Sequence, residues 1–109
     1  MTEMRDLHWS PAEKQVARRA YQKALENEKN ALIFKFKDRA AKIKTIEDVW
    51  KLVHWTEICG KEIDEKYDYR YSVLPMVFGR LIREREIVWE DLTGLGEDKT
   101  EFIRAFVRL

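Results

Sequence analysis

The sequence is poor in residues that cross-link or interrupt a chain. Its 109 residues include one Cys, two Pro and four Gly. A single Cys cannot form an internal disulfide, so Cys59 is typical of a protein in a reducing compartment and is expected to be a small buried apolar side chain. So few Gly and Pro residues in a chain that is 38% charged predict helices with short connections.

The sequence also lacks an excess of charge of either sign and any long apolar run. It contains 21 Lys and Arg against 20 Asp and Glu, whereas nucleic-acid-binding proteins usually carry a clear positive excess. The longest run without a strongly polar residue, Val73 to Gly79, is too short to cross a bilayer. Residues 1–6 contain no apolar stretch of the kind found in signal peptides. We therefore expect one soluble, cytoplasmic domain over residues 1–109, with no integral membrane association and no nucleic-acid partner.

Residue types that support catalysis or metal binding are scattered along the sequence. His8 lies in the N-terminal segment, and His54 and Cys59 are five residues apart, a spacing that places them on different faces of a helix. Many carboxylates lie four residues from a Lys, as in Glu57 with Lys61, which is typical of solvated helix surfaces. The sequence therefore predicts a protein without enzymatic activity or a metal site.

The first predicted helix is long. Ser10, Pro11 and Glu13 form a capping box with Pro in the first turn, and the helix is expected to run from residue 11 to 43. It would span about 50 Å, longer than a compact domain of this size, so its second half should project as an arm. An apolar arm is unstable alone in water, so we expect it to pack on a twofold mate, the alternative being a helix broken near residues 27–30. The expected dimer interface comprises Leu32, Ile33, Phe36, Ala40, Ile43 and Trp50.

Four further helices are expected. The second begins at the capping box of Thr45 and Asp48 and ends near Tyr67. The third begins at the N-cap Ser72 and ends near Arg85, a short helix covers residues 88–95, and the last covers 97–109. The sequence thus predicts an all-α fold with a long N-terminal helical arm and a small helical head, dimerising through the arm.

The second predicted helix has two apolar rows. The row expected in the core contains Val49, Val53, Gly60, Ile63 and Tyr67, with Leu52 and Cys59 at its edge. A second row consists of Trp50, His54 and Ile58, at i, i+4, i+8 spacing. It indicates a contact surface, because a Trp with charged neighbours is typical of binding hot spots. The candidate partner-binding residues are Trp50, His54, Glu57, Ile58 and Lys61, and Trp55 points in a third direction.

A basic group lies near the end of the first helix, beside Phe34 and Phe36. Three functions are open for it: contact with phosphate, an acidic protein partner, or a solvated helix face. Nearby carboxylates such as Asp38 dilute the positive charge and favour the solvated face. The group consists of Lys35, Lys37, Arg39, Lys42 and Lys44.

Several short matches, spread over nearly the whole chain, give the sequence a family resemblance. They are Trp50-Lys51-Leu52, Glu62-Ile63-Asp64, Lys66-Tyr67-Asp68, Arg70, Ser72-Val73 and Val77-Phe78, with outlying matches at Trp9-Ser10 and Glu90 to Thr93. In these residues the sequence resembles the fluorescence recovery protein family of cyanobacteria. The resemblance implies an all-helical homodimer that binds the C-terminal domain of photoactivated orange carotenoid protein. It implies faster reversion of that partner to the orange form, an end to phycobilisome quenching, and no bound cofactor.

The family's functional patch is only partly present. The patch combines a Trp, a His-Asp pair and an Arg: Trp50 is kept, Val53 and His54 stand at the His-Asp positions, and Gly60 stands at the Arg position. The aromatic and basic positions of the head hold Met76 and Phe102. Because charge pairs set partner choice, a second hypothesis is a divergent homologue with an interaction or assembly role toward a different protein.

Overall fold

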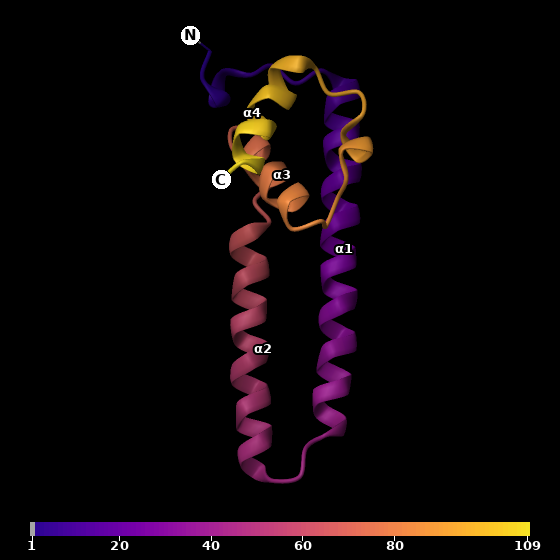
Figure 1. Cartoon of the computed structure of the whole chain (residues 1–109), viewed down its shortest axis with the longest axis vertical. Helices are drawn as coiled ribbons and strands as arrows, with labels where there is room; N and C mark the ends of the chain where they lie inside the picture. The colour runs from indigo at the N-terminus through magenta and orange to yellow at the C-terminus, as the bar shows by residue number, and fades with distance from the viewer. Residues whose placement is uncertain (1) are drawn as a thin grey trace.

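The two long helices begin where the capping sequences predict. The computed structural model describes residues 2–109, with α1 at Pro11–Ala41 and α2 at Ile46–Lys66 (Figure 1). At α1, the Ser10 hydroxyl accepts a hydrogen bond from Glu13 N at 3.1 Å, and the Glu13 carboxylate accepts one from Ser10 N at 3.0 Å. Thr45 and Asp48 form the same box at α2. The prediction of one unbroken first helix is confirmed, and the helix ends two residues earlier than expected.

The arm is a hairpin of two antiparallel helices (Figure 1). The second half of α1 lies beside α2 of the same chain, in a molecule that measures 57 × 23 × 22 Å. Leu52 is buried between the helices, and Leu32 and Ile43 line the hollows between them. A short turn after residue 41 brings α2 back along this half of α1, so α2 covers part of it, and its packing on another subunit stays a prediction.

The predicted core row of α2 is partly wrong. Val53 is 46% exposed, and a Cβ added at Gly60 would meet no atom within 4 Å. Leu52, Trp55, Cys59 and Ile63 line the hollows between α2 and α1, and Val49 is half-buried. A single neighbouring helix covers only a narrow strip of α2, so the flank that carries Val53 and Gly60 stays uncovered.

The head packs three short elements on the N-terminal half of α1 (Figure 1). These are α3 (Leu74–Arg83), the 3-10 helix η2 (Trp89–Leu92) and α4 (Glu97–Val107), and another 3-10 helix, η1 (Met4–Asp6), precedes α1. Small α1 side chains let the head approach closely, since Ala17, Ala20 and Ala24 are buried. The core also contains Trp9, Leu74, Val77, Phe78, Leu81, Ile87, Leu92 and Ile103. The all-α fold with an arm and a small head is confirmed.

Two details of the head differ from the sequence prediction. The N-cap of α3 is Val73 rather than Ser72, and it makes no side-chain cap; the first turn is closed by the backbone N–H of Leu74, which donates to Arg70 O at 3.0 Å. The short helix expected over residues 88–95 is the single 3-10 turn η2, followed by Gly94 at φ 108°. Positive φ suits glycine and ends the turn.

Two contacts join the head to the arm. The segment between α2 and α3 carries Tyr67, Tyr69 and Tyr71, and the rings of Tyr67 and Tyr69 pack edge-on against Tyr21 of α1 at 5.4 and 4.8 Å. Lys66, at the end of α2, binds the carboxylates of Glu28 on α1 and Glu84 just after α3. Burial alone would lower the pKa of Lys66, but the two carboxylates raise it. These contacts fix the head at the base of the arm.

A buried ion pair closes the far end of the head. Glu13 of α1 accepts hydrogen bonds from Gly96 N at 2.8 Å and from Lys99 Nζ at 3.1 Å, and both charged residues are buried. Burial alone would raise the pKa of Glu13, but the N–H groups of Ser10 and Gly96 together with the Lys99 ammonium lower it to about 2. One carboxylate therefore caps α1 and anchors the start of α4.

This carboxylate should make the stability of the head dependent on pH. Because the pKa of Glu13 in the folded chain lies below its ordinary value of 4.5, its stabilisation is present above that pH and is lost as the pH falls toward 2. We expect Glu13→Gln to lower the free energy of unfolding at neutral pH by about 3 kcal/mol. The loss should shrink at acid pH in urea titrations at several pH values. The exposed Glu97→Gln is the control, and an equal effect would contradict the assignment.

Candidate contact surface on the arm

The arm exposes large apolar side chains on both of its helices. Trp50 of α2 is 63% exposed and Phe34 of α1 is 74% exposed. The others on the arm are Ile33, Phe36, Ile46, Val53 and Ile58. Single exposed apolar residues are ordinary, but a group of this size on one element indicates a contact surface.

Helix geometry places most of these side chains on one side of the hairpin. Leu32 of α1 and Leu52 of α2 are directed into the arm. Each residue turns the helix by about 100°. About the α1 axis, this rotates the side chains of Phe36, Ala40 and Ile33 by about 40–100° from that of Leu32. About the α2 axis, it rotates the side chains of Val53, Ile46 and Trp50 by about 100–160° from that of Leu52, in the same sense. In antiparallel helices of the same hand, rotation in the same sense leads to the same side. We call these six residues the apolar face: Ile33, Phe36, Ala40, Ile46, Trp50 and Val53.

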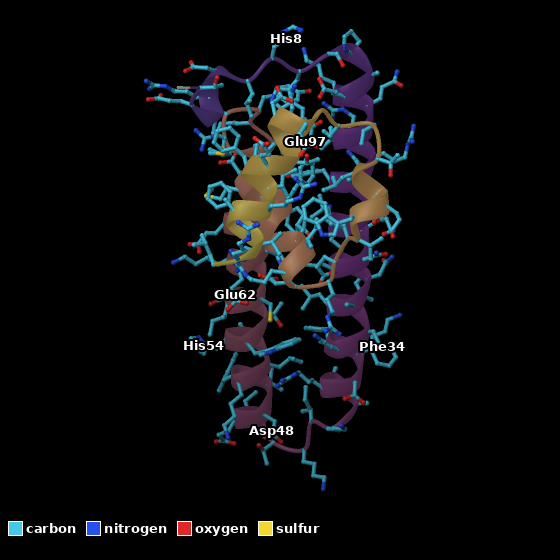
Figure 2. The ribbon with its side chains drawn as sticks, turned by 45° about the horizontal axis from the view of Figure 1, so that its top comes forward. His8, Phe34, Asp48, His54, Glu62 and Glu97 are labelled. Carbon is cyan, nitrogen blue, oxygen red and sulfur yellow. The ribbon has the colours of Figure 1, made fainter. Side chains whose placement is uncertain are left out.

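The predicted partner-binding residues do not all share this face. All five are exposed, and Trp50 lies on the apolar face with Glu57 at its border. His54 points outward from α2 and Phe34 outward from α1, at opposite edges of the arm (Figure 2). Lys61 lies on the same side of α2 as His54 but two turns further along the helix, and Ile58 lies further round α2. Within residues 2–109, Glu57 and Lys61 form no ion pair with each other, so both charges are available to a partner.

The predicted dimer residues divide in the same way. Ile33, Phe36, Ala40 and Trp50 lie on the apolar face. Leu32 and Ile43 are directed between α1 and α2 and stabilise the hairpin itself. The hairpin thus uses one strip of α1 internally and leaves the adjacent strip uncovered.

Sequence reasoning missed one contact inside the arm. The Arg39 guanidinium lies over the Trp55 ring at 4.2 Å from its centroid, and it joins α1 to α2. Beside this pair lies a hollow of about 390 Å³, which runs toward Lys66 and Glu28. Arg39 and Trp55 are 16 positions apart in the sequence, and no local sequence pattern pairs them. Only the pairing of α1 with α2 brings them together.

The geometry defines an elongated helical protein whose arm exposes a group of large apolar side chains. Across the described residues, 2–109, no group of three His, Cys, Asp or Glu side chains is placed to hold a metal ion. Nor does any helix in that range combine the length and the apolar character needed to cross a membrane.

The chain matches the family described as photoprotection regulator fluorescence recovery protein over residues 9–107. It is 38% identical to the fluorescence recovery protein of Synechocystis sp. PCC 6803, over the full length of both chains. Its fold matches the solved fluorescence recovery proteins of Fremyella diplosiphon (43% identity) and Synechocystis (39%), each with a TM-score of 0.88 over 94% of this chain and all of the other. The chain belongs to the fluorescence recovery protein family, as its sequence resemblance predicts.

Proposed function

We propose that the chain is a regulatory homodimer that acts as the fluorescence recovery protein does. In this proposal it works in the cytoplasm, binds the C-terminal domain of photoactivated orange carotenoid protein, and speeds the return of that protein to the orange form. Phycobilisome quenching then ends. The chain itself carries no cofactor and catalyses no covalent step. The observation that carries the proposal is the apolar face with exposed Trp50, on the arm of a member of this family.

The apolar face supports the dimer. It combines side chains from both arm helices, and a twofold axis would place each face against its own copy. Burying apolar area is favourable by about 25 cal/mol per Å², from which the entropy cost of association is subtracted. Gly60 lies on the same flank with open space around it, which permits close approach of a second helix.

The charged border of this face supports a protein partner. Trp50 lies about 160° round α2 from Leu52, at the outer edge of the apolar face, and Glu57 and Lys61 are exposed about two and three turns further along the helix. A buried aromatic anchor with polar residues around it is the usual arrangement of a binding hot spot. The border charges would contribute to the choice of partner and to the rate of encounter.

The test is to mix the purified protein with photoactivated orange carotenoid protein and time the red-to-orange decay. We expect the decay to become faster in proportion to the added protein. Trp50→Ala should remove at least about 2 kcal/mol of binding, since it truncates the anchor. Trp89→Ala, a partly exposed Trp of the head, is the matched control. Unchanged decay together with no co-elution would contradict the proposal.

A second candidate is a divergent homologue that binds another protein. It is favoured by Val53, Gly60 and Met76, which stand at positions where the family pattern has charged or aromatic residues. A pull-down from the organism's own cells would then retain one partner other than the carotenoid protein. That partner should be lost on His54→Ala, a variant outside the apolar face, while light scattering shows an unchanged oligomer.

A further inference from the structure

The side of the arm opposite the apolar face is charged. Lys35 and Lys42 of α1 and Lys51 of α2 lie about 60–100° from Leu32 and Leu52, in the sense opposite to the apolar residues. The outer part of the chain, residues 29–51, contains seven Lys and Arg against three Asp and Glu. The remaining residues of the chain contain 14 Lys and Arg against 17 Asp and Glu. A nearly neutral protein therefore carries its positive charge at the end of the arm.

A hollow lies on this charged side, between the end of α1 and the start of α2. Its volume is about 280 Å³. Cationic side chains from both helices line it, above an apolar floor. The lining residues are Arg39, Lys42, Ile43, Asp48, Lys51 and Leu52.

Arg39 is held in place by a stacking contact. One side of its guanidinium lies on the Trp55 ring at 4.2 Å, which restricts its rotation. Within residues 2–109 no carboxylate forms an ion pair with Arg39 or Lys51, and Lys42 pairs with the exposed Asp38. Asp48 is already engaged, because its carboxylate accepts hydrogen bonds from Lys44 N at 3.0 Å and Thr45 N at 3.2 Å. The N–H groups at the edge of a stacked guanidinium remain free for a bidentate pair with a carboxylate.

We propose that this hollow binds an acidic segment of a partner protein, with a carboxylate on Arg39, further acidic side chains near Lys42 and Lys51, and an apolar side chain on Leu52. Cations spread over two helices around an apolar floor fit an extended chain of Asp or Glu with apolar residues. An anionic membrane surface would contact the cations from outside and leave the apolar floor of Ile43 and Leu52 unfilled. Because it lies opposite the apolar face, the hollow stays open in the dimer, which then offers two such sites.

The probe is a fluorescein-labelled decapeptide of alternating Glu and Leu, measured by fluorescence anisotropy with the full-length protein. We expect saturable binding that weakens as salt rises, and none for the same peptide with Gln in place of Glu. Arg39→Gln should weaken binding about tenfold, because it removes the bidentate pair. Lys51→Gln, which leaves the Arg39–Trp55 contact in place, should weaken binding about threefold.

Lys37→Gln is the matched control. It removes one positive charge two residues from Arg39, about 200° round α1 and outside the hollow. We expect less than about a twofold change, because exposed charges contribute little. Equal losses for Lys37→Gln and Arg39→Gln would overturn the proposal in favour of a diffuse charge effect. Binding to vesicles of phosphatidylcholine and phosphatidylglycerol without binding to the peptide would also overturn it, in favour of a membrane.

Discussion

Ile33→Glu should convert the proposed dimer into a monomer. Ile33 lies on the apolar face, and in the dimer its replacement would bury a carboxylate without a partner. Such a charge costs about 3 kcal/mol or more, and a symmetric dimer would contain two of them. Because the two charges together cost about 6 kcal/mol, the dissociation constant should rise about ten-thousandfold or more. Light scattering after size exclusion would report the mass, and circular dichroism would check that the helices remain.

Phe34→Glu provides the matched control for this variant. It introduces the same charge one residue further along α1, on a side chain that is 74% exposed and points away from the hairpin. The dimer should keep its mass. If both variants were dimers, or both were monomers, the two positions would not differ in their effect on association. That result would contradict the proposed interface.

Gly79→Ala should strongly destabilise the head. A Cβ at this position would lie 2.4 Å from Phe106 Cβ and 3.1 Å from Ile103 O, so α3 and α4 must separate to admit it. Overpacking of this kind costs about 2–3 kcal/mol. For a domain of about 100 residues the Tm should then fall by about 10 °C or more. Thermal unfolding followed by circular dichroism would measure the fall.

Gly60→Ala is the informative comparison. Gly60 also lies within a helix, but open space surrounds it, so a methyl group there should stabilise α2 by up to about 1 kcal/mol. Measuring both variants in the Ile33→Glu background removes any contribution from association. A similar loss of stability at the two glycines would contradict the close packing of α3 on α4.

Local signals in the sequence determine the helices well. The two capping boxes locate the starts of α1 and α2, because the side-chain and backbone groups involved are only three residues apart. The unbroken course of α1 follows from the absence of Gly and Pro within it after Pro11. At α3 the same reasoning misplaces the cap by one residue, because backbone hydrogen bonds from Arg70 close the turn without the Ser72 hydroxyl.

Long-range pairing is what the sequence leaves open. Periodicity gives the angle between Val53 and Leu52, but it does not reveal that α1 covers only the Leu52 side. The exposure of Trp50 is predicted by the sequence, because Trp50 lies outside the predicted core row of α2. The Arg39–Trp55 pair is not visible, because it depends on the register of α1 against α2. For the same reason the hollow beside Arg39 can be seen only in the folded arm.

α1 belongs to both parts of the molecule. It runs from Pro11 in the head to Ala41 at the end of the arm without a break, a length of about 46 Å. On the other side of the molecule the two parts are joined through Lys66 and the irregular segment of residues 67–73. The head is therefore mounted on a stiff rod. Because α1 is continuous, a partner that binds and rotates the end of the arm would rotate the head with it. The length of α1 therefore sets the distance and the orientation between a partner bound at the end of the arm and one bound at the head.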